Sequence, residues 1–252
     1  MHFKTSVPDA LPLKHIKWAA LIPLAGEANR VLGRFEEILQ TTPRAALLFL
    51  SLKEAKDTFK AQTPPKPQEI RKCLKALRLI RQKKGHTLSP AFIKQVHALL
   101  TNKEPGCIRN RQNWVGPTGC RMEEAFCYPP APRYVLPYLK KLEKYAESQD
   151  GDPLIQTGII FAQFLMIHPF MDGNGRVARL LIPFLLYKKG VTSAPLFYMS
   201  GYFQKYRKEY FDRLLALSKE HDWEGWITFF LKGVVEQGKL LCKAHQRKAA
   251  DR

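Results

Sequence analysis

One stretch decides the fold: residues 154–179 read LIQTGIIFAQFLMIHPFMDGNGRVAR. Residues 154–167 are apolar on almost every side, which predicts a helix buried at the centre of the protein. Pro169 predicts that this helix ends at His168, because the residue before a proline avoids helical geometry. A new helix is expected to begin near Gly175. The stretch therefore places an imidazole between the end of a buried helix and the start of the next one.

The rest of the sequence predicts further helices and very little strand. Helices are expected over residues 18–42, 45–60, 68–84, 132–148, 175–189 and 203–221, from 223 onward, and after the Ser89-Pro90 start signal. Residues 103–130 mix Gly, Pro, Asn and Thr with isolated aromatic and aliphatic residues, which predicts a loop followed by a short β-hairpin. The expected fold class is therefore all-α, with one short hairpin and an N-terminal helical extension.

Composition excludes several classes of protein. The chain has 252 residues, of which 45% are hydrophobic, enough for a packed core. Five cysteines without a CxxC pair indicate free thiols in a reducing, cytoplasmic location rather than disulfides or a zinc site. No apolar run reaches the roughly 18 residues of a membrane helix. The formal net charge of +19 favours an anionic partner, either nucleic acid or an acidic surface, without choosing between them.

The segment over residues 68–84 is a basic amphipathic helix. An apolar stripe runs along one side, and lysine and arginine side chains cover the rest. A solvated face and a face that binds phosphates or a target are both compatible with this pattern.

Residues 168–179 combine groups that can hold and transfer a phosphate. Gly173 and Gly175 let backbone N–H groups approach an anion closely, and the helix start adds the positive end of a dipole. Arg176 and Arg179 are three positions apart, so they share one helix face and can bind phosphates together. Each feature alone has an ordinary structural explanation, but their combination after an apolar helix favours a site.

Two further side chains complete this expected site. Asp172 offers a carboxylate of the kind that Mg²⁺ uses when it bridges phosphates. The imidazole of His168 has an intrinsic pKa near neutrality, which suits a base that takes a proton from a hydroxyl.

The segment resembles the signature of the Fic family, HxFx[D/E]GNGRxxR. Every fixed position matches, namely His168, Phe170, Asp172, Gly173, Asn174, Gly175, Arg176 and Arg179. Stretches before and after the motif also resemble the family, so the resemblance covers about residues 20–240. It implies a Fic fold in three parts: an N-terminal helical region (1–63), a catalytic core (64–240) and a basic tail (241–252).

The resemblance implies a protein adenylyltransferase. Such an enzyme transfers AMP from ATP to a Tyr, Thr or Ser hydroxyl of a target protein or of the chain itself. His168 would be the base, and Asp172 would hold Mg²⁺ on the phosphates. Asn174 and the backbone of residues 173–175 would contact the α- and β-phosphates. Arg176 would neutralise the leaving phosphates, and Arg179 the γ-phosphate.

The resemblance also implies roles outside the motif. The hairpin around Ala125, Phe126 and Cys127 would be the flap that docks the target chain by strand addition. Tyr210 and Phe211 fall where family members contact the adenine side of the nucleotide.

Fic proteins with an N-terminal extension usually carry an inhibitory helix of pattern [S/T]xxxE[G/N]. Its glutamate pairs with the second motif arginine, here Arg179. The matching stretch, residues 53–63, puts Thr58 and Gln62 at the positions of the hydroxyl residue and the glutamate. A neutral amide cannot form the charge-assisted pair, so we hypothesise weak autoinhibition. An ordinary helix end before Pro64 is the alternative explanation.

Other functions remain open at this point. The same fold also supports transfer of phosphate, UMP or phosphocholine, and removal of AMP, although Asp172-Gly173 favours metal–ATP and Gln62 argues against removal. A basic nucleic-acid-binding protein accounts for the charge but leaves the motif unexplained. The intact motif argues against an inactive scaffold. A homodimer, and delivery into another cell without a classical signal peptide, are also compatible with the sequence.

Overall fold

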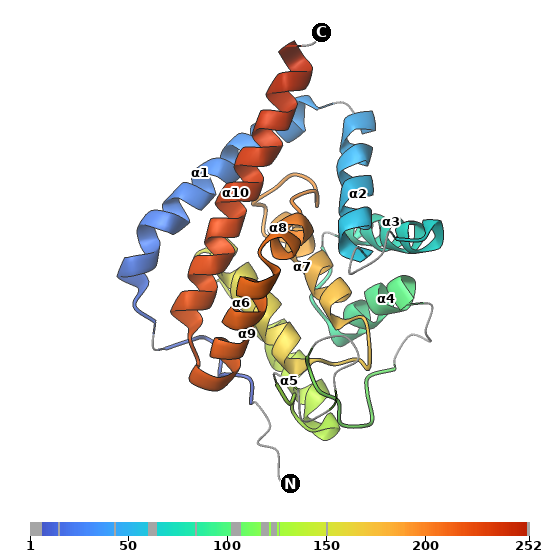
Figure 1. Cartoon of the computed structure of the whole chain (residues 1–252), viewed down its shortest axis with the longest axis vertical. Coiled ribbons are helices and arrows are strands. Elements are labelled where there is room, and N and C mark those ends of the chain that lie inside the picture. The colour runs from blue at the N-terminus through green and yellow to red at the C-terminus, as the bar shows by residue number, and fades with distance from the viewer. Residues whose placement is uncertain are drawn as a thin grey trace.

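Helix α6 (Pro153–Ile167) lies at the centre of the computed structural model, as its apolar sequence predicts (Figure 1). The structure describes residues 7–250 apart from positions 15, 43, 60–64, 84, 102–106, 117–120, 122–124, 126 and 150. The other helices are α1 (Trp18–Thr41), α2 (Arg44–Phe59), α3 (Pro67–Gln82), α4 (Pro90–Thr101), α5 (Pro132–Glu147), α7 (Asn174–Lys188), α8 (Ser200–Lys205), α9 (Arg207–Glu220) and α10 (Trp223–Ala250). The all-α class is therefore confirmed.

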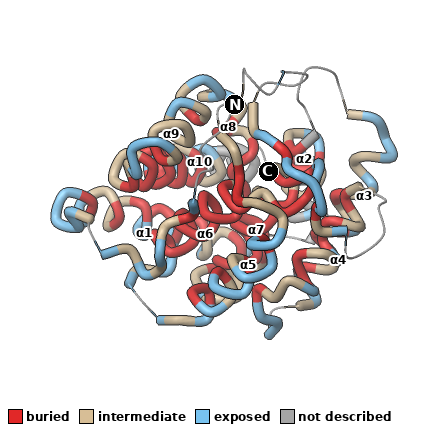
Figure 2. Tube along the Cα trace, turned by 90° about the horizontal axis from the view of Figure 1, so that it is seen from below, coloured by how far each residue is buried: buried red, intermediate tan, exposed pale blue. Residues whose placement is uncertain are grey.

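The start of α6 is set by its N-terminal cap. The side chain of Asp152 accepts hydrogen bonds from the backbone N–H groups of Leu154 (2.8 Å) and Ile155 (3.0 Å). This satisfies two amides that the helix itself cannot pair. Almost every side chain of α6 and most of α7 are buried, and Figure 2 shows both helices as buried segments in the middle of the molecule. The motif is therefore mounted on two rigid central helices.

Helices α6 and α10 approach each other closely at Gly158. A Cβ atom at Gly158 would lie 2.8 Å from the Phe230 ring, so only glycine allows this approach. The indole N–H of Trp226 donates to the carbonyl of Gly158 at 2.9 Å. Helix α10 thus holds the helix that carries His168 at its end.

Helices α1 and α10 pack along each other on one side of the molecule (Figure 1). The inner face of α1 buries small and large apolar residues, among them Ala28, Leu32 and Phe35. Residues 241–250, expected as a basic tail, continue α10 without a break. No described helix is long and apolar enough to span a membrane.

Two details differ from the expectation. The single helix predicted over residues 203–221 is wrong, because α8 ends at Lys205 and α9 begins at Arg207. At the break, the hydroxyl of Tyr206 donates to Glu236 of α10 at 2.8 Å, a tertiary contact that local propensity does not contain. Within the described residues, the expected hairpin is one antiparallel bridge between Val115 and Cys127.

Candidate active site

His168 occupies the end of α6 in an unusual backbone conformation. Its φ of 48° and ψ of 60° lie in the left-handed region, while its N–H still bonds the carbonyl of Phe164. The ring Nδ1 lies 3.2 Å from the carbonyl of Leu165. Since a carbonyl only accepts, Nδ1 carries the proton, and Nε2 has the free lone pair that a base needs. Burial lowers the pKa of His168 to about 4, so the ring is neutral at physiological pH.

Arg109 holds the backbone around His168 in place. Its Nε–H donates to the carbonyl of His168 at 2.8 Å, and Nη2 bonds the carbonyls of Pro130 and Ile167. The side chain is only 3% exposed, and burial lowers its pKa to about 10, at which it stays charged near neutrality. One guanidinium therefore satisfies two carbonyls at the end of α6, those of Ile167 and His168.

The loop after His168 is closed by Asn174. Its Oδ1 accepts from the N–H of Phe170 at 2.9 Å, and its Nδ2 donates to the carbonyl of Phe170 at 2.7 Å. Asn113 adds a second bond to the same carbonyl at 3.0 Å. The side chain of Asn174, expected to contact phosphates, is thus committed to shaping the loop, which leaves its backbone N–H for an anion.

Gly173 gives the loop its final turn. Its φ of 84° favours glycine, and a Cβ atom there would lie 2.9 Å from Cγ2 of Thr101. The residue directly precedes the first turn of α7, so the N–H groups of that turn face the loop. The turn at Gly173 and the helix start that follows it are arranged as the sequence predicts, and the binding of an anion there stays a prediction.

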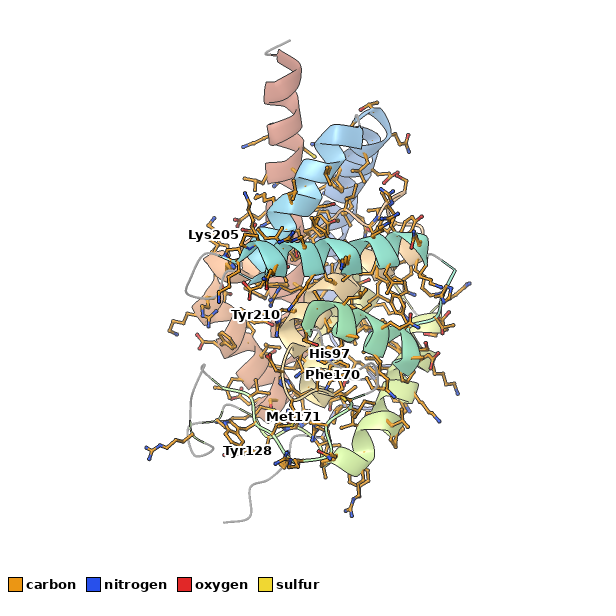
Figure 3. All side chains as sticks on the ribbon, turned by 90° about the vertical axis from the view of Figure 1, so that its right-hand side faces the viewer. His97, Tyr128, Phe170, Met171, Lys205 and Tyr210 are labelled. Atoms are coloured by element: carbon orange, nitrogen blue, oxygen red, sulfur yellow. The ribbon has the colours of Figure 1, made fainter. Side chains whose placement is uncertain are left out.

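His97 of α4 packs directly against the loop, and the sequence analysis missed it. Its ring stacks on Phe170 with centroids 3.7 Å apart, and the two residues are labelled next to each other in Figure 3. Its Nε2–H donates to the carbonyl of Asp172 at 3.0 Å. A lone buried histidine on a helix carries no distinctive sequence signal, so only the tertiary structure identifies this contact.

Asp172 and Arg176 form an ion pair at the mouth of the loop. Nη2 of Arg176 lies 2.8 Å from Oδ2 of Asp172, whose side chain is 67% exposed. The other oxygen, Oδ1, accepts from the N–H of Gly173 at 2.6 Å. Among the described residues, no group of three or more His, Cys, Asp or Glu side chains could hold a metal ion.

Arg179 contacts α2, whereas the sequence pattern places position 62 beside this arginine. Its Nη2 donates to the carbonyl of Thr58 at 2.8 Å, in the last turn of α2. The hydroxyl of Thr58 donates to the buried carboxylate of Glu54 at 3.0 Å, and the hydroxyl of Ser200 donates to the same oxygen. Gln62 lies outside the described residues. Among the described residues, Glu54 is an acidic side chain whose charge acts on Arg179.

The electrostatics of this cluster are coupled. Burial raises the pKa of Glu54 to about 7, while Ser200 and the charge of Arg179 lower it in part. Arg179 is buried too, which lowers its pKa, and the charge of Glu54 raises it. The helix end, the carboxylate and the guanidinium therefore form one buried polar network.

Comparison with known proteins identifies this arrangement. The sequence model of the Fic/DOC family matches residues 87–186, which include α4, the loop and nearly all of α7. Residues 87–186 are a Fic domain. A protein adenylyltransferase fic-1 of Caenorhabditis briggsae is 32% identical over 115 residues, which cover 43% of this chain and 21% of that protein. The chain thus spans about a fifth of the length of this curated relative.

The similarity to solved Fic structures extends beyond residues 87–186. A Fic family protein of Desulfovibrio desulfuricans superposes with a TM-score of 0.74 at 17% identity, over 90% of this chain and 75% of that chain. Fic-1 of Caenorhabditis elegans gives a TM-score of 0.66 at 17% identity, over 92% of this chain and 76% of that one. The likeness extends to the helices that surround the Fic domain.

The aromatic residues expected beside the adenine have different environments. Tyr210 is buried among aromatic rings, 5.0 Å from Phe203 between centroids, and burial raises its pKa to about 12. Its labelled position in Figure 3 lies above the loop. Phe211 is partly buried under the guanidinium of Arg207, 5.2 Å from the ring centroid. Tyr210 therefore packs in the core of the protein, and Phe211 lies nearer its surface.

The predicted flap of the Fic domain is only partly described. Val115 and Cys127 exchange backbone hydrogen bonds of 2.9 and 3.2 Å, and Ala125 is half-buried beside them. Phe126 lies outside the described residues. The bridge lies close to the loop, since Asn113 bonds the carbonyl of Phe170.

Proposed function

We propose that the chain transfers AMP from ATP to a Tyr, Thr or Ser hydroxyl of a protein, the chain itself included. The observation that supports this most is the state of His168, whose proton is held on Nδ1 and whose Nε2 is free at the edge of the anion loop. The curated relative named protein adenylyltransferase supports the same activity.

The reaction follows from this geometry. Nε2 of His168 takes the proton of the target hydroxyl, and the oxygen forms a bond to the α-phosphorus of ATP. The bond from that phosphorus to the bridging oxygen breaks, and pyrophosphate leaves. The N–H groups of Asn174 and Gly175 stabilise the charge on the phosphates, and Arg176 neutralises the leaving group. Catalysis thus comes from positioning and electrostatics.

Asp172 is the residue that would hold Mg²⁺. Its exposed carboxylate suits an ion that takes one or two protein carboxylates and completes its coordination with phosphates and water. Arg176, now paired with Asp172, would move to the phosphates. Bound Mg²⁺ would neutralise phosphate charge and so favour departure of pyrophosphate.

We propose that Glu54, on helix α2, restrains this activity. Arg179 is proposed to bind the γ-phosphate, yet its Nη2 is occupied by Thr58 of α2. Glu54 supports that contact through the Thr58 hydroxyl and through its charge. The chain would therefore be restrained while α2 is docked. The weak autoinhibition expected from Gln62 stays a separate prediction, because that residue lies outside the described part of the chain.

The reaction class is tested with ATP labelled at either phosphate. Label from the α position should stay on the modified protein in the wild type and be absent with His168→Ala. Retention of the γ label instead would indicate phosphate transfer, and tagged UTP used in preference to ATP would indicate UMP transfer. Release of AMP from a premodified target would indicate removal.

Substitution of His97 should reduce transfer because it displaces the loop. We expect His97→Leu to lower the rate on the order of 100-fold, the effect of about 1 Å of misplacement, and to raise the KM for ATP. His97→Gln keeps an N–H donor for the carbonyl of Asp172 and should recover part of the loss. Equal loss in both variants with an unchanged KM would mean that His97 only fills the core.

The pH profile should reveal the lowered pKa of His168. A base titrates from active to inactive as pH falls through its pKa, here about 4 rather than the usual value near 6.5. Transfer at pH 5 should therefore stay within about twofold of that at pH 7, whereas an unshifted histidine would lose about 25-fold. The Glu54→Gln variant is the right background, because Glu54 itself titrates near pH 7. A sharp loss near pH 6.5, with the fold intact by circular dichroism, would contradict the assignment.

A further inference from the structure

Helix α3 carries a row of basic side chains on its outer face. Arg71, Lys75 and Arg78 are exposed and follow the spacing of four and three that aligns residues on one side of a helix. They extend over about 10 Å of the helix axis. We call these three residues the basic stripe.

The opposite face of α3 is buried against the hydrophobic core. Cys73, Ala76, Leu77 and Ile80 are buried, and the helix packs against α2, α4 and α7. The orientation of α3 is therefore fixed, and the basic stripe points to solvent. The stripe is part of a rigid surface rather than of a mobile tail.

No acidic side chain neutralises the stripe within the described part of the chain. The ion pairs found there involve none of its three residues. The one acidic residue of α3, Glu69, accepts the backbone N–H of Lys66 at the helix start, 2.8 Å away. Like charges four apart on a helix repel each other, so an anionic partner would relieve this repulsion.

The composition of α3 selects among anionic partners. The helix contains no aromatic residue, so it offers no platform on which nucleic-acid bases could stack. Its apolar residues face the core, so none can insert into a membrane, as interfacial helices require. An acidic protein surface needs only the exposed charges, as do the phosphates of a DNA duplex, which the experiment below therefore includes as a competitor.

Helix α3 places the basic stripe near the candidate active site. Helix α3 packs on α4, and α4 carries His97 against the loop. In Figure 3, α3 and α4 lie on the same side of the molecule, with Phe170 and Met171 below them. We propose that the basic stripe docks an acidic surface of the target protein beside the hydroxyl that is modified. This inference rests on the proposed transferase function.

The experiment compares two triple charge reversals. The first changes the basic stripe (Arg71→Glu, Lys75→Glu, Arg78→Glu). The matched control changes three exposed lysines elsewhere, on α5 and α10 (Lys140→Glu, Lys144→Glu, Lys232→Glu), which also lack ion pairs among the described residues. Circular dichroism and melting curves check that both variants fold.

The first readout is binding and needs no catalysis. A fluorescent poly-glutamate peptide serves as the acidic probe, with a short DNA duplex and anionic vesicles as competitors. We expect the stripe variant to bind the peptide at least about tenfold more weakly than the control variant. Equal weakening in both variants would overturn the proposal, as would DNA or vesicles that bind more tightly through the same three residues.

The second readout is labelling of lysate proteins with adenosine-tagged ATP. The stripe variant should label other proteins at least about tenfold less than the control variant, and the difference should shrink at high salt. Self-modification should be the same in both. Unchanged lysate labelling in the stripe variant would overturn the docking role. Absence of all labelling in both the wild type and the Glu54→Ala variant would instead refute the transferase function, and the peptide readout would still decide whether the stripe binds an acidic partner.

Discussion

Replacement of His168 should lower AMP transfer by about 100- to 10,000-fold, the contribution of a general base. The reason is geometric: Nε2 is the one ring nitrogen that can accept the hydroxyl proton, because Nδ1 is held by the carbonyl of Leu165. Single-turnover transfer from α-labelled ATP to the chain itself measures the loss. ATP binding should stay within about threefold of the wild type, since Arg109 and Asn174 hold the loop through backbone atoms and not through the imidazole.

The matched control for this prediction is His168→Asn. Asparagine tolerates the left-handed backbone that His168 adopts, so this variant removes the base with less strain than His168→Ala. Both variants should be equally inactive. Activity within tenfold of the wild type in either variant would exclude His168 as the base, and activity lost only in His168→Ala would indicate a backbone role.

Replacement of Glu54 should have the opposite effect and increase self-modification. Glu54→Ala removes the acceptor of the Thr58 and Ser200 hydroxyls and the charge that stabilises Arg179 on α2. A buried hydrogen-bonded carboxylate contributes on the order of 1–3 kcal/mol, so release of Arg179 should raise the rate by about 5- to 150-fold. Initial rates of α-label incorporation at an ATP concentration below the KM measure the gain.

Two further variants test whether the gain comes from Glu54 and Arg179. Glu54→Gln keeps hydrogen-bonding atoms without the charge, so its gain should be smaller than that of Glu54→Ala. Adding Arg179→Ala to Glu54→Ala should remove the gain, because the γ-phosphate then has no guanidinium to bind. A Glu54→Ala variant that folds normally and is no faster than the wild type would refute restraint by α2.

The parts of this Fic domain that the sequence predicts well are those specified by neighbouring residues. The burial of α6, its end at His168 and the glycine turn at Gly173 each depend on a few consecutive side chains. The same local rules do not describe how helices meet. At the break, Tyr206 bonds Glu236, thirty positions later in the chain, and local helix propensity contains no information about such a contact, so the continuous helix predicted there was incorrect.

The contacts of Arg179 also depend on how two helices meet, which local sequence rules do not describe. The sequence pattern placed Thr58 and Gln62 beside the arginine; Gln62 lies outside the described residues, and the register of α2 against α7 brings Thr58 to Arg179, with Glu54 behind it. The spacing of four between Glu54 and Thr58 was a usable signal, since it places both on one helix face. Ser200, 142 positions beyond Thr58, gave no such signal.

The bond between Arg179 and the last turn of α2 also links ligand affinity to the order of that helix. If ATP and α2 compete for one guanidinium, thermodynamic reciprocity requires each to weaken the other by the same factor. A nucleotide would then loosen part of the protein that binds it, whereas ligands ordinarily stabilise the fold they occupy. The amides of α2 would exchange with solvent faster when ATP is bound, and the order of α2 would report occupancy of the nucleotide site.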